Sequence, residues 1–586
     1  MRAVLLILLC FFCSLSSTAR QYYLRGEVHD EAGNSLQNVS LLNQRTGYVY
    51  KTGSSGSFGI TSTVVSDTFV ISLSGYKAEK RKVVAGEYAS VELKRLAISA
   101  STMRVNKLQS LTKGMAREDH RRWFAGDETY ASLVENRFVN TQRFPSTGIS
   151  LNVDKASYSN VRRFLNLSTL VPPDAVRTEE MLNYFNLGYE EPAAGNMFAV
   201  KTQVTSSPWN NNNQLYFISL SARKLNLDTL PPSHLIFLVD VSGSMDMPNR
   251  LPLLKSGFRM LVGNLREKDS VSMVVYGGVT GIMLNTTSGA EKEKILKAID
   301  DLEPGGSTPG ESGVKLAYSV ARNHFIKGGN NRVILATDGD FNVGLRSEEE
   351  LEEMIARHRQ TGIYLTCLGV GMGNYKDSKI QTLARKGNGN FAYIDNHSEA
   401  EKVLLTEFTQ TMYAVADDAY MHVEFNPEVV KEYRLIGFDN KVGAITDTMA
   451  VVEGGEIGSG YSMTGIFEII LQKPGAVVTA DKLATLHLRY KYPGDTAEQQ
   501  ECISSYYNFQ PLEQLSQCYR FSAVVAAFGS MLKSSAYINH WQWTDLQAQA
   551  VLVADPADIR QQEFLQLVQQ AKTLYTKGRK KKKPGK

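Results

Sequence analysis

The segment His234-Leu-Ile-Phe-Leu-Val-Asp-Val-Ser-Gly-Ser244 contains the strongest indication of fold class in the chain. Its first six residues form a largely apolar run, which is typical of a parallel strand buried on both faces. Asp240, Ser242 and Ser244 follow where this strand should end, and they offer one carboxylate and two hydroxyls. Such hard oxygen donors suit Mg²⁺, Mn²⁺ or Ca²⁺ rather than zinc. Because an Asp-x-Ser turn is also a common helix cap, the surrounding sequence must decide between the two interpretations.

Residues 231–412 alternate between strand and helix patterns on both sides of that segment. Further strands are expected at Ser270–Tyr276, Arg332–Ala336, Ile363–Val370 and Phe391–Ile394. Helical spacing is found at Leu251–Leu265, Glu291–Leu302, Ser347–Gln360, Ser378–Lys386 and Glu399–Met412. This order predicts an α/β doubly wound, Rossmann-like domain with helices on both faces of the sheet. Ligands of such folds bind outside the carboxyl ends of the strands.

Two further segments place oxygen ligands at that same edge. Gly305-Gly-Ser-Thr308 follows a predicted helix, and its glycines allow a close backbone approach. Ala336-Thr-Asp338-Gly339 ends another apolar strand. The sequence therefore predicts a metal site formed by Asp240, Ser242, Ser244, Thr308 and Asp338.

These residues, in this order and spacing, resemble the metal-ion-dependent adhesion site of von Willebrand factor type A domains. The resemblance implies that the hydroxyls of Ser242, Ser244 and Thr308 bind a divalent cation directly or through water. Asp240 and Asp338 would bind directly or through water, depending on the ligand state. One coordination position would stay open for an Asp or Glu of a protein ligand. Mg²⁺ is the expected ion, with Mn²⁺ and Ca²⁺ as alternatives.

The resemblance extends to one bacterial branch that flanks the domain with its own N-terminal and C-terminal associated regions. Asn136–Phe185 is similar to the first, and Tyr433–Gly437, Gly455–Gly458 and Phe521–Leu532 are similar to the second. We therefore expect mixed α+β regions at 131–230 and 413–575. Because each flank is small, we also expect the two to pack together beside the central domain.

An all-β module is expected before these regions. Residues 21–96 contain short alternating strands separated by Gly-rich turns, which predicts a small β-sandwich. Gly26-x-Val28, Gly56-x-Phe58 and Gly75-Tyr76 resemble the carboxypeptidase regulatory-like domain, which implies an accessory module without catalytic residues. Residues 97–130 have few periodic signals and are interpreted as a linker.

The N-terminus has the pattern of a signal peptide, residues 1–19. Met1-Arg2 is positive, Ala3–Phe12 is apolar apart from a cysteine, and Ser17-Thr-Ala19 offers small residues for cleavage. An uncut anchor is the alternative. We therefore expect an exported protein in the periplasm, at the outer membrane or on the cell surface. In that setting Cys502 and Cys518 could form a disulfide or remain two free thiols.

The charge is unevenly distributed. The chain of 586 residues has a net charge of +4, but the tail 576–586 alone holds seven Lys and Arg and no acid. The rest of the chain therefore carries −3, which does not indicate a nucleic-acid-binding protein. The tail could contact anionic lipid or lipopolysaccharide, or could be a solvated extension.

These features favour a non-enzymatic binding protein that captures an acidic group of a protein partner through its bound cation. The alternative is an assembly or chaperone-like subunit that docks onto an envelope complex through the same metal site. The sequence contains neither a Gly-x-Ser-x-Gly elbow nor a His-Glu-x-x-His motif, so an enzyme is not expected.

Overall fold

The computed structural model describes most of the chain, as two compact units. The described residues are 22–31, 33–53, 55–73, 76–94, 129–130, 133, 135–306, 310–339, 345–371, 377–438, 454–473, 481–538 and 540–577. The units are Met1–Glu128 and Thr129–Lys586. The predicted signal peptide, nearly all of the linker and nearly all of the basic tail lie outside the described residues.

The first unit is a β-sandwich, as predicted. Its strands are β1 (Tyr22–Asp30), β2 (Ser40–Asn43), β3 (Val49–Lys51), β4 (Ser57–Ser62), β5 (Ser66–Ser72), β6 (Glu79–Val84) and β7 (Tyr88–Leu93). One sheet pairs β1 with β4 and β7, and the other has the order β3-β2-β5-β6. Alternate residues such as Leu24, Val28, Phe58 and Phe69 fill the space between the sheets. The resemblance to the carboxypeptidase regulatory-like domain stays a prediction.

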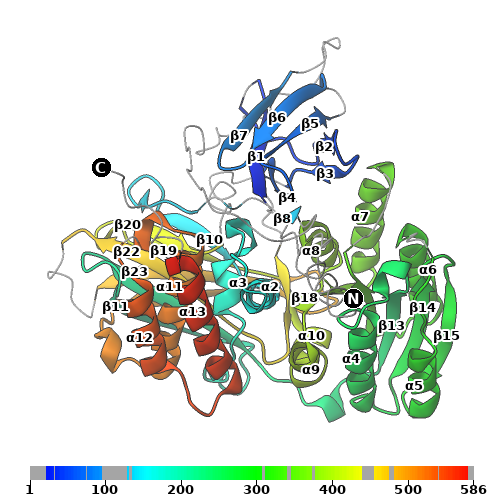
Figure 1. Cartoon of the computed structure of the whole chain (residues 1–586). Coiled ribbons are helices and arrows are strands. Elements are labelled where there is room, and N and C mark those ends of the chain that lie inside the picture. Colours follow the sequence, from blue (N-terminus) through cyan, green and yellow to red (C-terminus); the bar gives the residue numbers. More distant parts are fainter. Residues whose placement is uncertain are drawn as a thin grey trace, which may run out of the picture. The chain divides into compact units, whose positions relative to one another are not determined.

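The predicted doubly wound domain is confirmed in the second unit, coloured green in Figure 1. Its six-stranded sheet has the order β15-β14-β13-β16-β17-β18, and only the edge strand β15 is antiparallel to its neighbour. The strands are β13 (Ser233–Asp240), β14 (Ser270–Tyr276), β15 (Gly281–Ser288), β16 (Asn330–Thr337), β17 (Ile363–Val370) and β18 (Phe391–Ile394).

Helices cover both faces of this sheet. They are α4 (Leu251–Gly263), α5 (Lys292–Asp300), α6 (Gly310–Asn323), α7 (Leu345–Gln360), α8 (Asp377–Lys386), α9 (His397–Glu401) and α10 (Phe408–Met412), with a π-helical turn at Lys402–Thr406 between the last two. Phe237 and Val239 of β13 pack with the buried face of α4, whereas Ile236 and Leu238 pack with α6. Alternate residues of one strand thus enter two different cores, which explains its unbroken apolar run.

The two flanks form one β-sandwich, so the expectation that they pack together is confirmed. One sheet has the order β11-β12-β22-β20-β9 and the other the order β10-β19-β23-β24, with β21 also paired to β19. Strands before the central domain are β9 (Val139–Asn140), β10 (Ser146–Ser150), β11 (Phe198–Ser206) and β12 (Gln214–Ala222). Strands after it are β19 (Ala414–Phe425), β20 (Val430–Ile436), β21 (Gly455–Gly458), β22 (Ser462–Leu471), β23 (Lys482–Lys491) and β24 (Glu498–Tyr506). Because β12 pairs with β22 and β10 with β19, neither flank has a complete sheet of its own.

A helical layer belongs to the same flanks. It consists of α2 (Ala156–Asn166), α3 (Thr178–Leu182), α11 (Gln517–Leu532), α12 (Trp543–Val553) and α13 (Ile559–Lys577). Phe185, Phe521 and Phe564 meet edge to face, which joins the chain after α3 to α11 and α13. Short turns of 3₁₀ helix lie at Pro173–Ala175, Leu227–Thr229, Gly243–Met245, Leu512–Gln514 and Ala536–Ile538.

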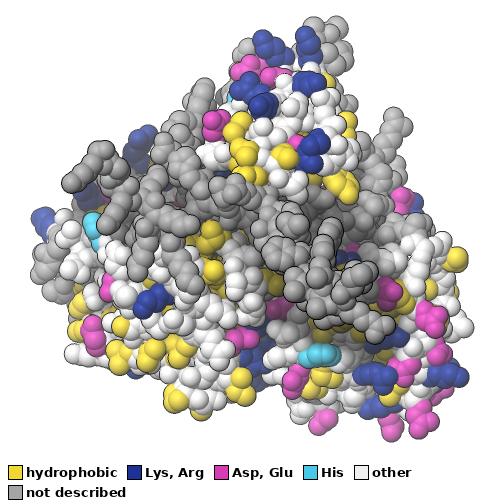
Figure 2. Space-filling model, viewed as in Figure 1, with side chains coloured by type: hydrophobic (Ala, Val, Ile, Leu, Met, Phe, Trp, Pro, Cys, Tyr) yellow, Lys and Arg dark blue, Asp and Glu magenta, His cyan; other side chains and the backbone are white. Residues whose placement is uncertain are grey.

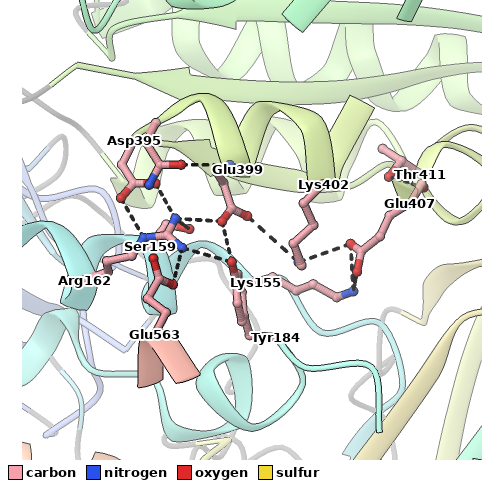
Figure 3. Close-up of polar contacts among 11 residues, drawn as sticks. Lys155, Ser159, Arg162, Tyr184, Asp395, Glu399, Lys402, Glu407, Thr411 and Glu563 are labelled. Carbon is pink, nitrogen blue, oxygen red and sulfur yellow. Dashed lines mark hydrogen bonds and ion pairs between the residues drawn. The ribbon is translucent and has the colours of Figure 1, made fainter. Parts of the chain in front are cut away.

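A buried polar network joins the central domain to both flanks (Figure 3). Its centre is Arg162 on α2, whose exposed fraction is 1%. Arg162 donates from Nε to Asp395 at 2.9 Å and from Nη2 to Glu399 at 2.7 Å, where β18 leads into α9. Its Nη1 donates to Glu563 on α13 and to the Tyr184 hydroxyl, both at 3.0 Å. One guanidinium thus fixes the end of the central domain against α2 and α13.

The network continues to Glu407, which predicts an acid-sensitive contribution to stability. Burial alone would raise the pKa of Glu407, but the ammonium groups of Lys155 and Lys402 lower it from 4.5 to about 2. Stability from this carboxylate is therefore complete above pH 4.5 and is lost as the pH falls towards 2. We expect Glu407→Gln to remove this pH dependence, on the order of 3 kcal/mol at most, in urea denaturation measured across that range.

Glu401→Gln is the matched control for this prediction, because Glu401 is exposed and lies in the same stretch of chain. Its acid denaturation profile should follow that of the wild type. If Glu401→Gln flattened the profile as much as Glu407→Gln, the buried ion pairs would not be its origin.

The cysteines do not form the disulfide that the sequence left open. Cys502 is exposed on β24, Cys518 is partly buried on α11, and both are free thiols; Cys367 is a buried thiol on β17 as expected.

Among the described helices, none has the combined length and apolar character needed to cross a bilayer. Around α5, acidic and basic side chains alternate over the visible surface (Figure 2).

Candidate metal centre

The predicted ligands meet at the carboxyl ends of two neighbouring strands. β13 ends at Asp240 and continues into a single 3₁₀ turn, Gly243–Met245, whereas β16 ends one residue before Asp338. The strands are parallel, with Val239 opposite Ala336. Asp240 and Asp338 therefore leave the sheet side by side, as the sequence predicted, and their exposed fractions are 0% and 4%.

Hydrogen bonds hold the oxygens of the motif loop in a convergent arrangement. The Ser242 N–H donates to Asp240 Oδ1 at 2.9 Å, and the Thr337 hydroxyl donates to Asp240 Oδ2 at 3.1 Å. The hydroxyls of Ser242 and Ser244 lie 3.0 Å apart. Ser242 is buried, but Ser244 is exposed, so the cluster opens to solvent on the Ser244 side.

The glycine-rich loop that leads to Thr308 is anchored against the motif loop. Gly243 N–H donates to the Gly306 carbonyl at 3.1 Å, and Gly305 N–H donates to the Val241 carbonyl at 2.6 Å. Gly306 has φ +82°, and a Cβ there would lie 2.3 Å from Gly278 Cα, so only glycine fits. Thr308 itself lies outside the described residues. The described part of the loop ends two residues before it, at Gly306, whose carbonyl accepts from Gly243 between the two serines.

Arg250 also belongs to this cluster, although no sequence signal indicated it. This side chain precedes α4 and is only 8% exposed. Its Nη1 donates to Asp338 Oδ2 at 2.6 Å and to the Ser244 carbonyl at 2.5 Å. At the end of β17, Gly371 leaves room for the side chain, because a Cβ there would lie 2.5 Å from Arg250 Nε. Arg250 thus contacts the loops that follow β13, β16 and β17.

The electrostatics of the cluster follow from its burial. Removal from water raises the pKa of Asp240 to about 6, and the like charge of Asp338 acts in the same direction. Within the described residues, no three His, Cys, Asp or Glu side chains come together as a metal cage. A cation at this edge would therefore depend on two carboxylates combined with serine hydroxyls. That donor set fits Mg²⁺, Mn²⁺ or Ca²⁺, which prefer hard oxygens.

Three family descriptions match successive parts of the chain. The von Willebrand factor description matches residues 125–216, the von Willebrand factor type A domain matches 234–410, and the C-terminal region of the uncharacterized protein YfbK matches 410–574. Von Willebrand factor type A domains mediate protein–protein interactions, generally without catalysis, and many bind a divalent cation.

Parts of the chain are also similar to known proteins in sequence or in structure. The uncharacterized protein sll0103 of Synechocystis is 26% identical over 36% of this chain and 49% of its own length. A solved von Willebrand factor type A structure from Catenulispora acidiphila covers 66% of this chain and 97% of its own, at 12% identity and a TM-score of 0.39.

YfbK of Escherichia coli is similar over a much longer stretch. The two sequences are 38% identical over 471 residues, which cover 76% of this chain and 81% of YfbK. The chain therefore belongs to the YfbK family of bacterial von Willebrand factor type A proteins.

Proposed function

We propose that this chain is an exported, non-enzymatic binding protein that engages an acidic group of a protein partner through a divalent cation. Its ligands would be Asp240, Ser242, Ser244, Thr308 and Asp338, with Mg²⁺ as the ion. The observation that carries the proposal is the convergence of the two serine hydroxyls beside two buried carboxylates at one sheet edge. The membership of a protein-interaction family supports it.

The residues of the cluster would hold the cation and leave it able to bind one further ligand. Asp240 is fixed in place by the Ser242 N–H and the Thr337 hydroxyl, so its carboxylate needs little reorganisation on binding. The serine hydroxyls supply neutral oxygens and leave compensation of the cation's charge to the two carboxylates. A cation in such a site favours an external carboxylate, since both are hard. The exposed side of Ser244 is where that group would enter.

The cellular setting is part of the same proposal. The signal-like pattern of residues 1–19 supports export to the periplasm, the outer membrane or the cell surface. In that setting the partner would be an envelope or surface protein that presents an Asp or Glu. Capture of such a partner by the full chain should require Mg²⁺ or Mn²⁺ and should be abolished by chelation.

The metal site is tested by thermal unfolding with and without cation. With Mn²⁺ at one hundred times its dissociation constant, the wild type should gain about 2.7 kcal/mol, because the ion binds only the folded chain. Asp240→Ala and Asp338→Ala should show no metal-dependent change. The readout is the difference between cation and chelator for each variant, so a lower midpoint of the variant itself does not matter.

Asp246→Ala is the matched control, because this exposed acid lies two residues beyond Ser244 and outside the motif. It should keep the full metal-dependent stabilisation. If titration calorimetry detected no Mg²⁺ or Mn²⁺ binding to the wild type, the proposed metal-dependent function would be wrong.

A further inference from the structure

We propose that Arg250 is a positioning residue that acts through Asp338 and makes the metal centre depend on an external carboxylate. This inference rests on the proposed function. Its basis is a contact made by a residue that is not itself a predicted metal ligand. The Arg250 guanidinium lies at hydrogen-bond distance from the Asp338 carboxylate, with an Nη1–Oδ2 distance of 2.6 Å.

The position of Arg250 is built into the fold. Its side chain is about nine-tenths buried, and its Nη1 is shared between the Asp338 carboxylate and the Ser244 carbonyl. Gly371, with φ +79°, lies against its stem, where any larger residue would collide with the guanidinium. Ordering such a long side chain costs conformational entropy, and its hydrogen bonds to Asp338 and Ser244 offset that cost. The enclosure therefore fixes a positive charge beside Asp338.

The charges of the centre then determine its selectivity. Asp240 and Asp338 carry two negative charges, and Arg250 neutralises one of them. Together with a bound divalent cation, these three side chains therefore carry one net positive charge. A single carboxylate from a partner restores neutrality. Without Arg250, the two aspartates alone would balance the cation, and an incoming carboxylate would add an uncompensated charge.

This account predicts opposite changes in two affinities. Arg250 repels the cation and competes with it for Asp338, so Arg250→Gln should bind Mn²⁺ about tenfold more tightly. The same change removes the positive charge that attracts the partner's carboxylate. Affinity of the Mn²⁺-loaded protein for a blocked Gly-Asp-Gly tripeptide should therefore fall about tenfold. A purely structural role for Arg250 would weaken both.

The experiment is isothermal titration of the full chain with Mn²⁺, then of the loaded protein with the tripeptide, with Gly-Asn-Gly as the uncharged comparison. Arg250→Lys keeps the charge and should keep both affinities within about threefold of the wild type. If Arg250→Gln fails to fold, Arg250→Lys still decides, because a folded lysine variant with tight Mn²⁺ binding and lost tripeptide binding would overturn the charge account.

The possible failures are distinguishable. A wild type that binds no Mn²⁺ contradicts the proposed function as a whole. A wild type that binds Mn²⁺ and the tripeptide, together with an Arg250→Gln variant in which both affinities fall or neither changes, contradicts only the role of Arg250.

Discussion

Arg162→Ala should lower the free energy of unfolding by about 3–5 kcal/mol, because it removes the cation from a buried network of carboxylates. Arg162 donates to Asp395, Glu399 and Glu563, which come from the central domain and from α13. The carboxylates of Asp395 and Glu399 are almost fully buried. Loss of the guanidinium would leave Asp395 without the counter-charge that Figure 3 shows beside it.

The measurement is urea denaturation of the full chain, followed by tryptophan fluorescence. Arg259→Ala is the matched control: Arg259 pairs with Asp300, and both side chains are about half exposed. Because exposed ion pairs contribute little, this variant should lose less than about 1 kcal/mol. Equal losses in the two variants would mean that the buried network adds nothing beyond an ordinary surface pair.

Glu456→Ala should have a similarly large effect at the opposite end of the central sheet. Arg332 of β16 is fully buried, and its Nη1 and Nη2 both donate to Glu456 of β21. The Thr366 hydroxyl, 2.9 Å from Nη1, would remain as a neutral partner for the guanidinium. An unpaired buried charge costs about 3–5 kcal/mol, so the denaturation midpoint should fall accordingly.

The double variant Arg332→Met/Glu456→Leu provides the test of that reason. Replacement of both charges by apolar groups of similar size avoids the unpaired cation, so most of the loss should be recovered. A double variant as unstable as Glu456→Ala would mean that packing, rather than charge burial, explains the effect. The metal-dependent stabilisation should persist in both variants, since Arg332 lies near the start of β16 whereas Asp338 follows its end.

Elements with a strong local pattern were predicted well from the sequence. The run from His234 to Val239 became β13, and the motif residues after it lie together with Asp338 as expected. Two elements of the central domain were missed. The helix α6 begins at Gly310, close to a glycine-rich loop, and edge strand β15 is rich in polar residues, Asn285-Thr-Thr-Ser288. The strand lacks the apolar alternation on which such predictions depend. The helix does have apolar residues at helical spacing, Val314, Ala317, Tyr318 and Ala321, and was overlooked beside that loop.

The ion pairs could not be predicted, because their members are far apart in the chain. Arg250 and Asp338 are separated by 88 residues, Arg332 and Glu456 by 124, and Arg162 and Asp395 by 233. No local pattern marks an arginine as buried, and a charge is normally assigned to the surface. Only the folded chain brings each guanidinium to its carboxylate.

The sequence alone was enough to predict the central fold and to select Asp240, Ser242, Ser244 and Asp338, which lie together in the structure. Strand periodicity and loop spacing are local properties, and these predictions depend on nothing else. The tertiary structure alone decided how the flanks share their sheets, since hydrogen bonds between strands form across the whole intervening domain. It also decided which charge lies beside Asp338. Electrostatic energy depends on distance in space and on burial, and neither is written in the order of residues.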